Sequence, residues 1–159
     1  MLVIFFKESP ISTKVFSKLI GSQLNKEIVS CRKCRRLVKF REKIAKNKTK
    51  RFINENYWGK PVLCYVNKKG KLIILGLAPA AHGGNRTGRV FTGDKSADFL
   101  INCLHKVKFV NQPTSTNKND GLKMLNSYMT PVLKCVPRED KPKSDELASC
   151  FYFLKKEIN

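Results

Sequence analysis

The sequence predicts one α/β domain over residues 1–159, because segments with the pattern of strands alternate with segments with the pattern of helices. Two apolar runs, Pro61–Val66 and Leu72–Leu75, have the length of strands, and a third follows at Tyr128–Val136. Ser96–Lys108 lies between the last two runs and has apolar residues at helical spacing. This order of strand, helix and strand is typical of α/β proteins.

Two further helices are expected near the ends of the chain. From Ser12 to Ile28, apolar residues recur in steps of three and four, and Ser12 or Thr13 can cap the first turn. The last helix is expected from Asp145 to Ile158, after a turn at Lys141–Lys143. The apolar face of the middle helix is expected to consist of Phe99, Leu100, Cys103, Leu104 and Val107.

Loops and turns connect these elements. Asn67–Gly70 has the residues of a hairpin turn between the first two strands. Asn111–Asp120 is polar and is expected to be a loop. The second strand continues into Gly76–Gly84, which consists almost entirely of small residues. Small residues after a buried strand indicate a place where the backbone approaches another group closely.

The charge of the chain indicates a polyanionic partner. The formal net charge is +20, from 32 Lys and Arg against 12 Asp and Glu, whereas solubility needs a magnitude of about 2–8. Nucleic acid is the first candidate and an anionic membrane surface is the rival. The sequence has no apolar run long enough for a transmembrane helix, and Leu2–Phe6 is too short for a signal-peptide core. We therefore expect an intracellular, cytoplasmic protein.

The segment from Arg41 to Arg51 is rich in Lys and Arg. Such a segment is either a solvated helix face or a set of phosphate contacts, and the sequence favours neither.

The six cysteines indicate a metal site or buried thiols, because disulfides are rare inside cells. Cys31 and Cys34 form a CxxC pair, and Cys135 and Cys150 follow about a hundred residues later. Four thiolates suit structural zinc or an iron–sulfur cluster, and the wide second pair favours a cluster that joins distant segments. Cys64 and Cys103 are interpreted as ordinary thiols.

The segment from Gly76 to Asp94 is the candidate ligand site. It follows a strand, where open α/β sheets bind ligands, and it offers backbone N–H groups with one His, two Arg, one Phe and one Asp. It lacks the GxxxxGK[ST] pattern of a phosphate-binding loop, which argues against nucleotide hydrolysis.

This run closely resembles motif one of the iron–sulfur uracil-DNA glycosylases of the fifth, thermophile-type family. The resemblance extends to Cys31–Cys34, to Tyr57–Val62, to Thr130–Pro137 and to the Lys141-Pro142 turn with Cys150, and it spans about residues 15 to 155.

The resemblance implies a fold, a cofactor and a reaction. The fold would be a three-layer α/β/α sandwich on a four-stranded parallel sheet. A structural 4Fe–4S cluster would be held by Cys31, Cys34, Cys135 and Cys150. The reaction would be hydrolysis of the N-glycosidic bond of a deaminated base in DNA, after the base leaves the stack. DNA is then the expected partner, and we expect a monomer.

The resemblance also assigns roles within motif one. Phe91 would be the aromatic floor for the flipped base, unless it is a core residue. The backbone at Ala78, Pro79, Ala80 and Gly83 would form the pocket wall.

Charged and polar groups of the motif carry the remaining roles. His82 would contact the sugar or the water, unless it only caps backbone. Asp94 would orient water or stabilise charge on the sugar, and it is equally well suited to cap a helix. Asn85, Arg86 and Arg89 would hold phosphates.

Two departures from the family pattern bear on activity. Asp140 stands where relatives have the Asn that reads uracil. Since an ionised Asp only accepts hydrogen bonds, a wider or shifted base preference is expected. The chain also lacks the His-Pro-Ser motif, because its only histidines are His82 and His105, so we expect the last strands and this motif to be absent. The alternative function is a DNA-binding iron–sulfur protein with weak or no turnover.

Overall fold

The computed structural model describes residues 2–6, 22–66 and 72–158 of the chain. In chain order the elements are β1 (Leu2–Phe6), α2 (Ser22–Ser30), α3 (Arg35–Lys46), the 3-10 helix η1 (Lys50–Phe52), β2 (Tyr65–Val66), β3 (Leu72–Gly76), α4 (Gly84–Thr87), α5 (Lys95–Lys106), β4 (Ser127–Pro131), the 3-10 helix η2 (Arg138–Asp140) and α6 (Ser144–Ile158). This is the α/β composition that the sequence predicts.

The four strands form one mixed sheet in the order β1-β3-β4-β2. The central pair, β3 and β4, is parallel, with Leu72 opposite Ser127 and Gly76 opposite Pro131. The outer strands β1 and β2 are antiparallel to their neighbours. The prediction of a parallel sheet is therefore wrong for β1 and β2 and holds for the central pair. Parallel neighbours need a long crossover, which α5 and its loops provide between β3 and β4.

Two strand predictions are corrected by the sheet. The predicted hairpin between the first two runs does not form, because β4 lies between β2 and β3, and its turn at residues 67–70 lies outside the described residues. Leu2–Phe6, to which the sequence pattern assigned no element, pairs along β3 as β1. The third predicted strand ends at Pro131, although the N–H of Val132 still donates to the Gly76 carbonyl.

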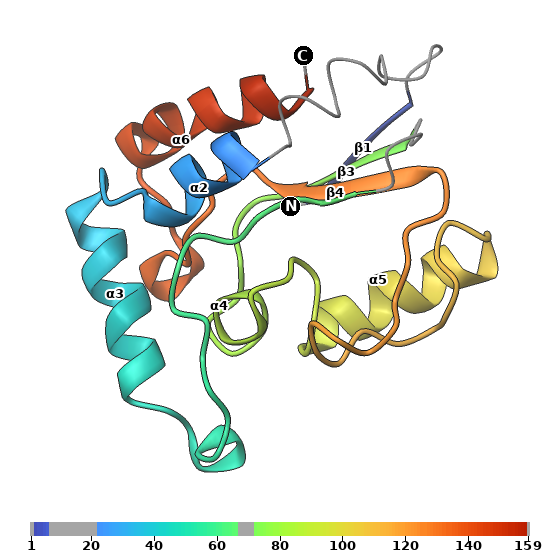
Figure 1. Ribbon diagram of the computed structural model, residues 1–159, viewed down its shortest axis with the longest axis horizontal. Coiled ribbons are helices and arrows are strands. Elements are labelled where there is room, and N and C mark those ends of the chain that lie inside the picture. The colour runs from blue at the N-terminus through green and yellow to red at the C-terminus, as the bar shows by residue number, and fades with distance from the viewer. Residues whose placement is uncertain (1, 7–21, 67–71, 159) are drawn as a thin grey trace.

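Helices lie on both sides of this sheet (Figure 1). The side chains of β3 alternate: Leu72 and Ile74 pack in the core that includes Leu100 of α5, whereas Ile73 packs on the opposite face with Ile158 of α6. Figure 1 shows α6 on one side of the strands and α5 on the other. The alternation along a strand is what places one helix against each face.

The buried face of α5 differs from the prediction. Its buried residues are Ala97, Leu100, Ile101 and Leu104. Phe99 and Val107 are 75% and 62% exposed, and Cys103 is exposed as well. Two overlapping stripes of this helix have helical spacing, and packing against the sheet decides which of them is buried.

The two terminal helices agree better with their patterns. α6 begins one residue before its predicted start and ends at Ile158 as predicted. α2 buries Leu24 and Ile28 on its inner face, whereas the predicted segment from Ser12 to residue 21, with its cap, lies outside the described residues. Asn111–Asp120 contains no helix or strand, as expected of a loop.

Candidate functional site

The glycine-rich segment after β3 folds into a tight loop that ends in the single turn of α4. The Ala80 carbonyl accepts from the N–H of Asn85, and the Gly83 carbonyl accepts from the N–H groups of Arg86 and Thr87. At Gly88, φ is +77°, a conformation that glycine adopts without steric cost. Gly83 and Pro79 are buried, while Ala78 and Ala80 remain partly exposed. These are the predicted wall residues, and the structure brings them together.

Phe91 lies over the carboxyl end of β3. A Cβ at Gly76 would be 2.8 Å from Cζ of Phe91, so the ring sits directly on the glycine backbone. Phe91 has φ of +46°, and such a conformation costs a non-glycine residue about 1–3 kcal/mol. Its carbonyl accepts a hydrogen bond from Ser115 Oγ at 2.9 Å. Phe91 is half-buried against the core, so the ring both packs inward and keeps an accessible part.

Asp94 combines the two roles that the sequence left open. Its Oδ1 accepts from the N–H of Ala97 at 2.9 Å and so caps α5. Its Oδ2 lies against Gly83, 1.9 Å from where a Cβ would stand, so only glycine fits there. Burial raises the pKa of Asp94, against the lowering effect of the N–H groups of Ala97 and Ser96. A partly desolvated carboxylate therefore faces the loop.

His82 is partly exposed on the same loop and has an aromatic neighbour on each side. Its Nδ1 lies 3.0 Å from Oη of Tyr57, and its ring is 6.4 Å from that of Phe52. The sequence assigned no role to Tyr57, although it lies in a segment that resembles the family.

The three residues expected to bind phosphate face inward instead. Asn85, Arg86 and Arg89 are 1%, 5% and 4% exposed. Arg86 donates to the carbonyls of His82 at 2.6 Å and Gly93 at 3.1 Å, and it forms an ion pair with Glu55. This placement argues against phosphate contact, because donors used within the protein are not free for a partner.

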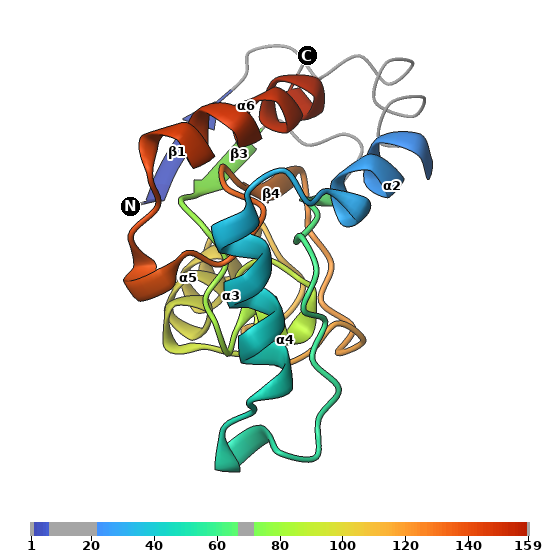
Figure 2. The same ribbon diagram turned by 90° about the vertical axis from the view of Figure 1, so that its left-hand side faces the viewer.

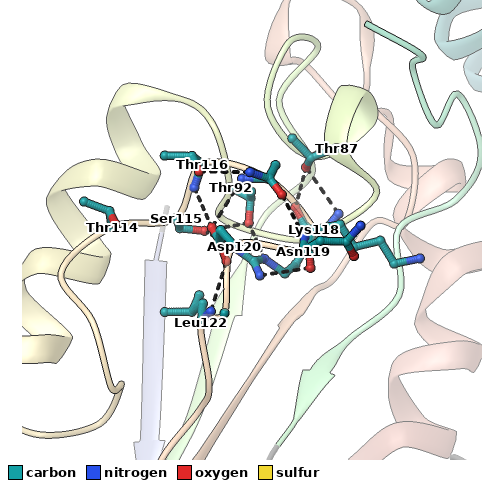
Figure 3. A network of polar contacts seen from close by, with 12 residues as sticks. Thr87, Thr92, Thr114, Ser115, Thr116, Lys118, Asn119, Asp120 and Leu122 are labelled. Atoms are coloured by element: carbon teal, nitrogen blue, oxygen red, sulfur yellow. Dashed lines mark hydrogen bonds and ion pairs between the residues drawn. The ribbon is translucent and has the colours of Figure 1, made fainter.

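Arg89 is the centre of a second network, which holds the loop at residues 111–122 to motif one. Figure 3 shows Thr92, Ser115 and Asp120 of this network close together. Its Nη2 lies 2.7 Å from Oδ2 of Asp120 and 2.9 Å from Oγ of Ser115, and its Nε donates to Thr92 Oγ1. Burial raises the pKa of Asp120, but Arg89 and the N–H groups of Leu122, Thr116 and Asn117 outweigh it and lower the pKa to about 2.

Asp140 lies at the end of η2, exposed, with φ of +54°. The structure records no contact that joins it to Phe91 or Asp94, so its expected role in reading the base stays a prediction.

The four predicted ligand cysteines line one pocket. Cys31 and Cys34 come from the α2–α3 junction, Cys135 from the segment after β4, and Cys150 from α6. The pKa of Cys135 is raised to about 11, chiefly by burial, which Arg41 opposes and to which the neighbouring thiols of Cys150 and Cys31 add. Cys64 and Cys103 do not line this pocket, as predicted.

Two donors stabilise thiolate character in this pocket. Nη1 of Arg41 lies 2.9 Å from Sγ of Cys135, and the N–H of Lys134 donates to Sγ of Cys150 at 3.2 Å. Arg41 is 2% exposed. The sequence did not single it out, although helical spacing from Leu37 and Val38 places it on the buried face of α3.

The arrangement of the four cysteines bears on which metal group they could hold. Within the described ranges, no three His, Cys, Asp or Glu side chains converge closely enough to hold one metal ion. A single zinc would need four sulfurs about 2.3 Å from one point. Four thiols around a shared pocket, with hydrogen-bond donors to two of them, match the four-cysteine donor set of an iron–sulfur cluster.

A basic stripe runs along the exposed face of α3 and consists of Arg35, Lys39, Lys43 and Lys46. The only acidic residue of this helix, Glu42, is bound to Arg32 at 2.6 Å. Figure 2 shows α3 crossing the face of the molecule in front of α4, which carries the end of motif one. Like charges four residues apart destabilise a helix by about 0.2–0.5 kcal/mol a pair, so the stripe carries an uncompensated cost.

Comparison with known proteins identifies relatives of the chain. Residues 64–159 match the family model described as the uracil DNA glycosylase superfamily. A type-5 uracil-DNA glycosylase of Mycobacterium bovis is 44% identical over 135 residues, which are 85% of this chain and 50% of that protein. Enzymes of the same name from Pyrobaculum aerophilum and Thermus thermophilus are 38% identical over 82% of this chain and 57% and 59% of theirs. The chain thus spans about half the length of the curated relatives it matches.

Among the residues that the structure describes, no helix has the length and apolar character needed to cross a membrane.

Proposed function

The chain belongs to the uracil-DNA glycosylase superfamily, and from this premise we propose that it removes uracil, or another deaminated base, from DNA in base-excision repair. The observation that carries the proposal is the position of Asp94: its partly desolvated carboxylate lies against the backbone of Gly83, and Phe91 of the same segment packs on Gly76 at the end of β3. An aromatic surface, a carboxylate and small residues around one loop are what hydrolysis of an extruded nucleotide requires.

The proposed chemistry is hydrolysis at the sugar carbon. The bond between that carbon and the base nitrogen breaks, and the base leaves with the electron pair. A water oxygen bonds to the same carbon and gives up one proton, which the departing base anion takes up, so that the products are the free base and an abasic sugar. Asp94 orients this water and stabilises the positive charge that develops on the sugar. Phe91 stacks on the base and offsets part of the cost of extrusion, which is a few kcal/mol.

We further propose that Cys31, Cys34, Cys135 and Cys150 hold a 4Fe–4S cluster. Their shared pocket and the hydrogen bonds to Cys135 and Cys150 support it. When bound, the cluster supplies structural cross-linking of the α2–α3 junction to β4 and α6. Ala78 of motif one packs against the same core, so the pocket wall depends on this region being ordered.

The basic stripe of α3, defined above, is proposed as the phosphate-binding surface. It replaces Asn85, Arg86 and Arg89 in this role, because its four cations are exposed. The only acidic residue of α3, Glu42, is paired with Arg32. A phosphate backbone would remove the repulsion along the helix. We propose that the protein acts on DNA as a monomer, at the nucleoid, and that the helices around its sheet belong to a three-layer α/β/α sandwich.

The decisive experiment is single-turnover release of uracil from a labelled duplex, on protein with four irons by metal analysis. Release by this chain supports the proposed function. Binding of the duplex without release, with the cluster full, would establish the alternative of a DNA-binding iron–sulfur protein without turnover.

A further inference from the structure

The side chain of His82 is held by a tyrosine from a different segment of the chain. Oη of Tyr57 and Nδ1 of His82 are 3.0 Å apart. The two rings meet edge to face, with centroids 6.0 Å apart and planes inclined by 77°. The contact therefore uses one specific nitrogen of the imidazole and leaves Nε2 for another partner.

The segment that carries Tyr57 is fixed to motif one at several points. The Arg86 guanidinium stacks on the Phe52 ring, 3.9 Å from its centroid, and pairs with Glu55. The N–H of Trp58 donates to the Arg86 carbonyl at 2.8 Å. Arg86 also donates to the His82 carbonyl. The residues around Tyr57 and the backbone of His82 are therefore held by the same arginine, and this fixes the distance between the two side chains.

The chemistry of the two groups determines the direction of the hydrogen bond. A neutral imidazole has one N–H and one nitrogen with a free lone pair. A phenol is the better donor of the two, because its oxygen lone pairs are delocalised into the ring, whereas the imidazole lone pair is localised. This difference favours donation from Tyr57 to Nδ1, which leaves the proton of the neutral ring on Nε2.

We propose that Tyr57 is a positioning residue that holds His82 in the Nε2–H tautomer, so that His82 meets the extruded nucleotide as a hydrogen-bond donor and not as a general base. The tautomer is a property of the free protein. Its use on the nucleotide rests on the proposed function: an N–H donor beside the loop stabilises an oxygen that gains negative charge as the base leaves. Asp94, which accepts, and His82, which donates, then have complementary roles.

Nitrogen-15 NMR of the histidine side chains tests the tautomer directly, on the full chain with its cluster. The sequence has only two histidines, and His105→Gln assigns their signals. Above the pH at which imidazole titrates, we expect Nδ1 of His82 to be the unprotonated nitrogen and Nε2 the protonated one. In Tyr57→Phe, we expect Nδ1 to lose the shift of a hydrogen-bonded acceptor. A protonated Nδ1 in the unsubstituted protein would overturn the proposal.

Variants of His82 test its use. The amide nitrogen of Gln replaces Nε2 as a donor but cannot act as a base, whereas the shorter Asn places its amide nearer Nδ1. We expect His82→Gln to stay within about tenfold of the unsubstituted rate of base release, and His82→Asn to lose about 10²–10³-fold. Equal losses in both would refute a donor role through Nε2.

Tyr57→Phe completes the set. It should slow base release about three- to tenfold, the effect of one hydrogen bond, with duplex affinity unchanged. Tyr152→Phe, which removes an exposed hydroxyl on α6, is the matched control. If the unsubstituted chain released no base, the proposed function would fail, while the NMR result would still decide the tautomer.

Discussion

The carboxylate of Asp94 lies against the backbone of Gly83, in a space where a Cβ would come within 1.9 Å of Oδ2. The other oxygen of the same carboxylate caps α5 through the N–H of Ala97. One residue thus begins the crossover helix and packs against the glycine-rich loop at Gly83. This double use makes the chemical and structural roles of Asp94 separable by substitution.

Asp94→Asn should keep the cap and remove the charge, because Asn and Asp cap helices about equally well. We expect an unchanged melting temperature and a loss of base release of about 10²–10³-fold, measured in single turnover. Asp98→Asn, at an exposed position of the same helix, is the control. An active Asp94→Asn variant would leave Asp94 with the cap alone. Burial raises the pKa of Asp94, and the proposed role needs the ionised carboxylate. As pH is lowered, the rate of base release should therefore begin to fall at a higher pH than it would for an Asp with the ordinary pKa.

Phe91→Ala should weaken base release more than duplex affinity, because the extruded base is the part of the DNA that the ring would contact. Stacking of a base on an aromatic ring contributes about 1–3 kcal/mol, which is about a 5- to 150-fold effect on release. Phe99→Ala, at a residue 75% exposed on α5, should have no effect on either. Equal losses of release and affinity in Phe91→Ala would identify Phe91 as a core residue only.

Asp120→Asn should lower the free energy of unfolding by about 2–4 kcal/mol at neutral pH, because it leaves Arg89 buried without its counter-ion. The folded-state pKa of Asp120 is about 2, below the unfolded value of about 3.9. Its stabilising contribution is therefore complete above about pH 4 and is lost as pH falls towards about 2. Urea unfolding across this range should show that dependence, and the variant should lack it.

Replacing Lys39 and Lys43 together by Gln should weaken duplex binding and reduce its salt dependence. Each phosphate contact contributes about −0.9 to the slope of log affinity against log salt, so the slope should become less steep by about 2. Fluorescence anisotropy from low to moderate salt measures this. The control replaces Lys95 and Lys106 of α5 by Gln, which changes the net charge by the same amount. If this variant reduced the salt dependence of binding as much, binding would not be localised on α3.

Cys135→Ser should abolish iron incorporation and the visible absorption of the cluster, because it removes one of four proposed ligands. Cys103→Ser, at an exposed cysteine outside the shared pocket, should keep both. Full iron content in the Cys135 variant would exclude it as a ligand. Removal of the cluster by a chelator should also lower the melting temperature.

Local patterns in the sequence were sufficient for the features that depend on neighbours along the chain. The glycine-rich loop after β3, the cap of α5 by Asp94 and the bounds of α6 follow from spacing and side-chain type, and the structure confirms them. The grouping of the four predicted ligand cysteines came from spacing together with the family resemblance. All four line one pocket, and the cluster itself stays a prediction.

The tertiary structure alone decided which partner each group meets. Two arginines predicted to bind phosphate are buried, because Arg86 is paired with Glu55 and Arg89 with Asp120, which is 31 residues away. β3 lies between β1 and β4, and not beside β2, the strand that precedes it in the chain. Sequence patterns reflect hydrophobicity and local backbone preference, so they predict elements and their caps. Salt bridges and strand pairs between distant segments depend on which surfaces the fold brings together, and local spacing carries no information about that.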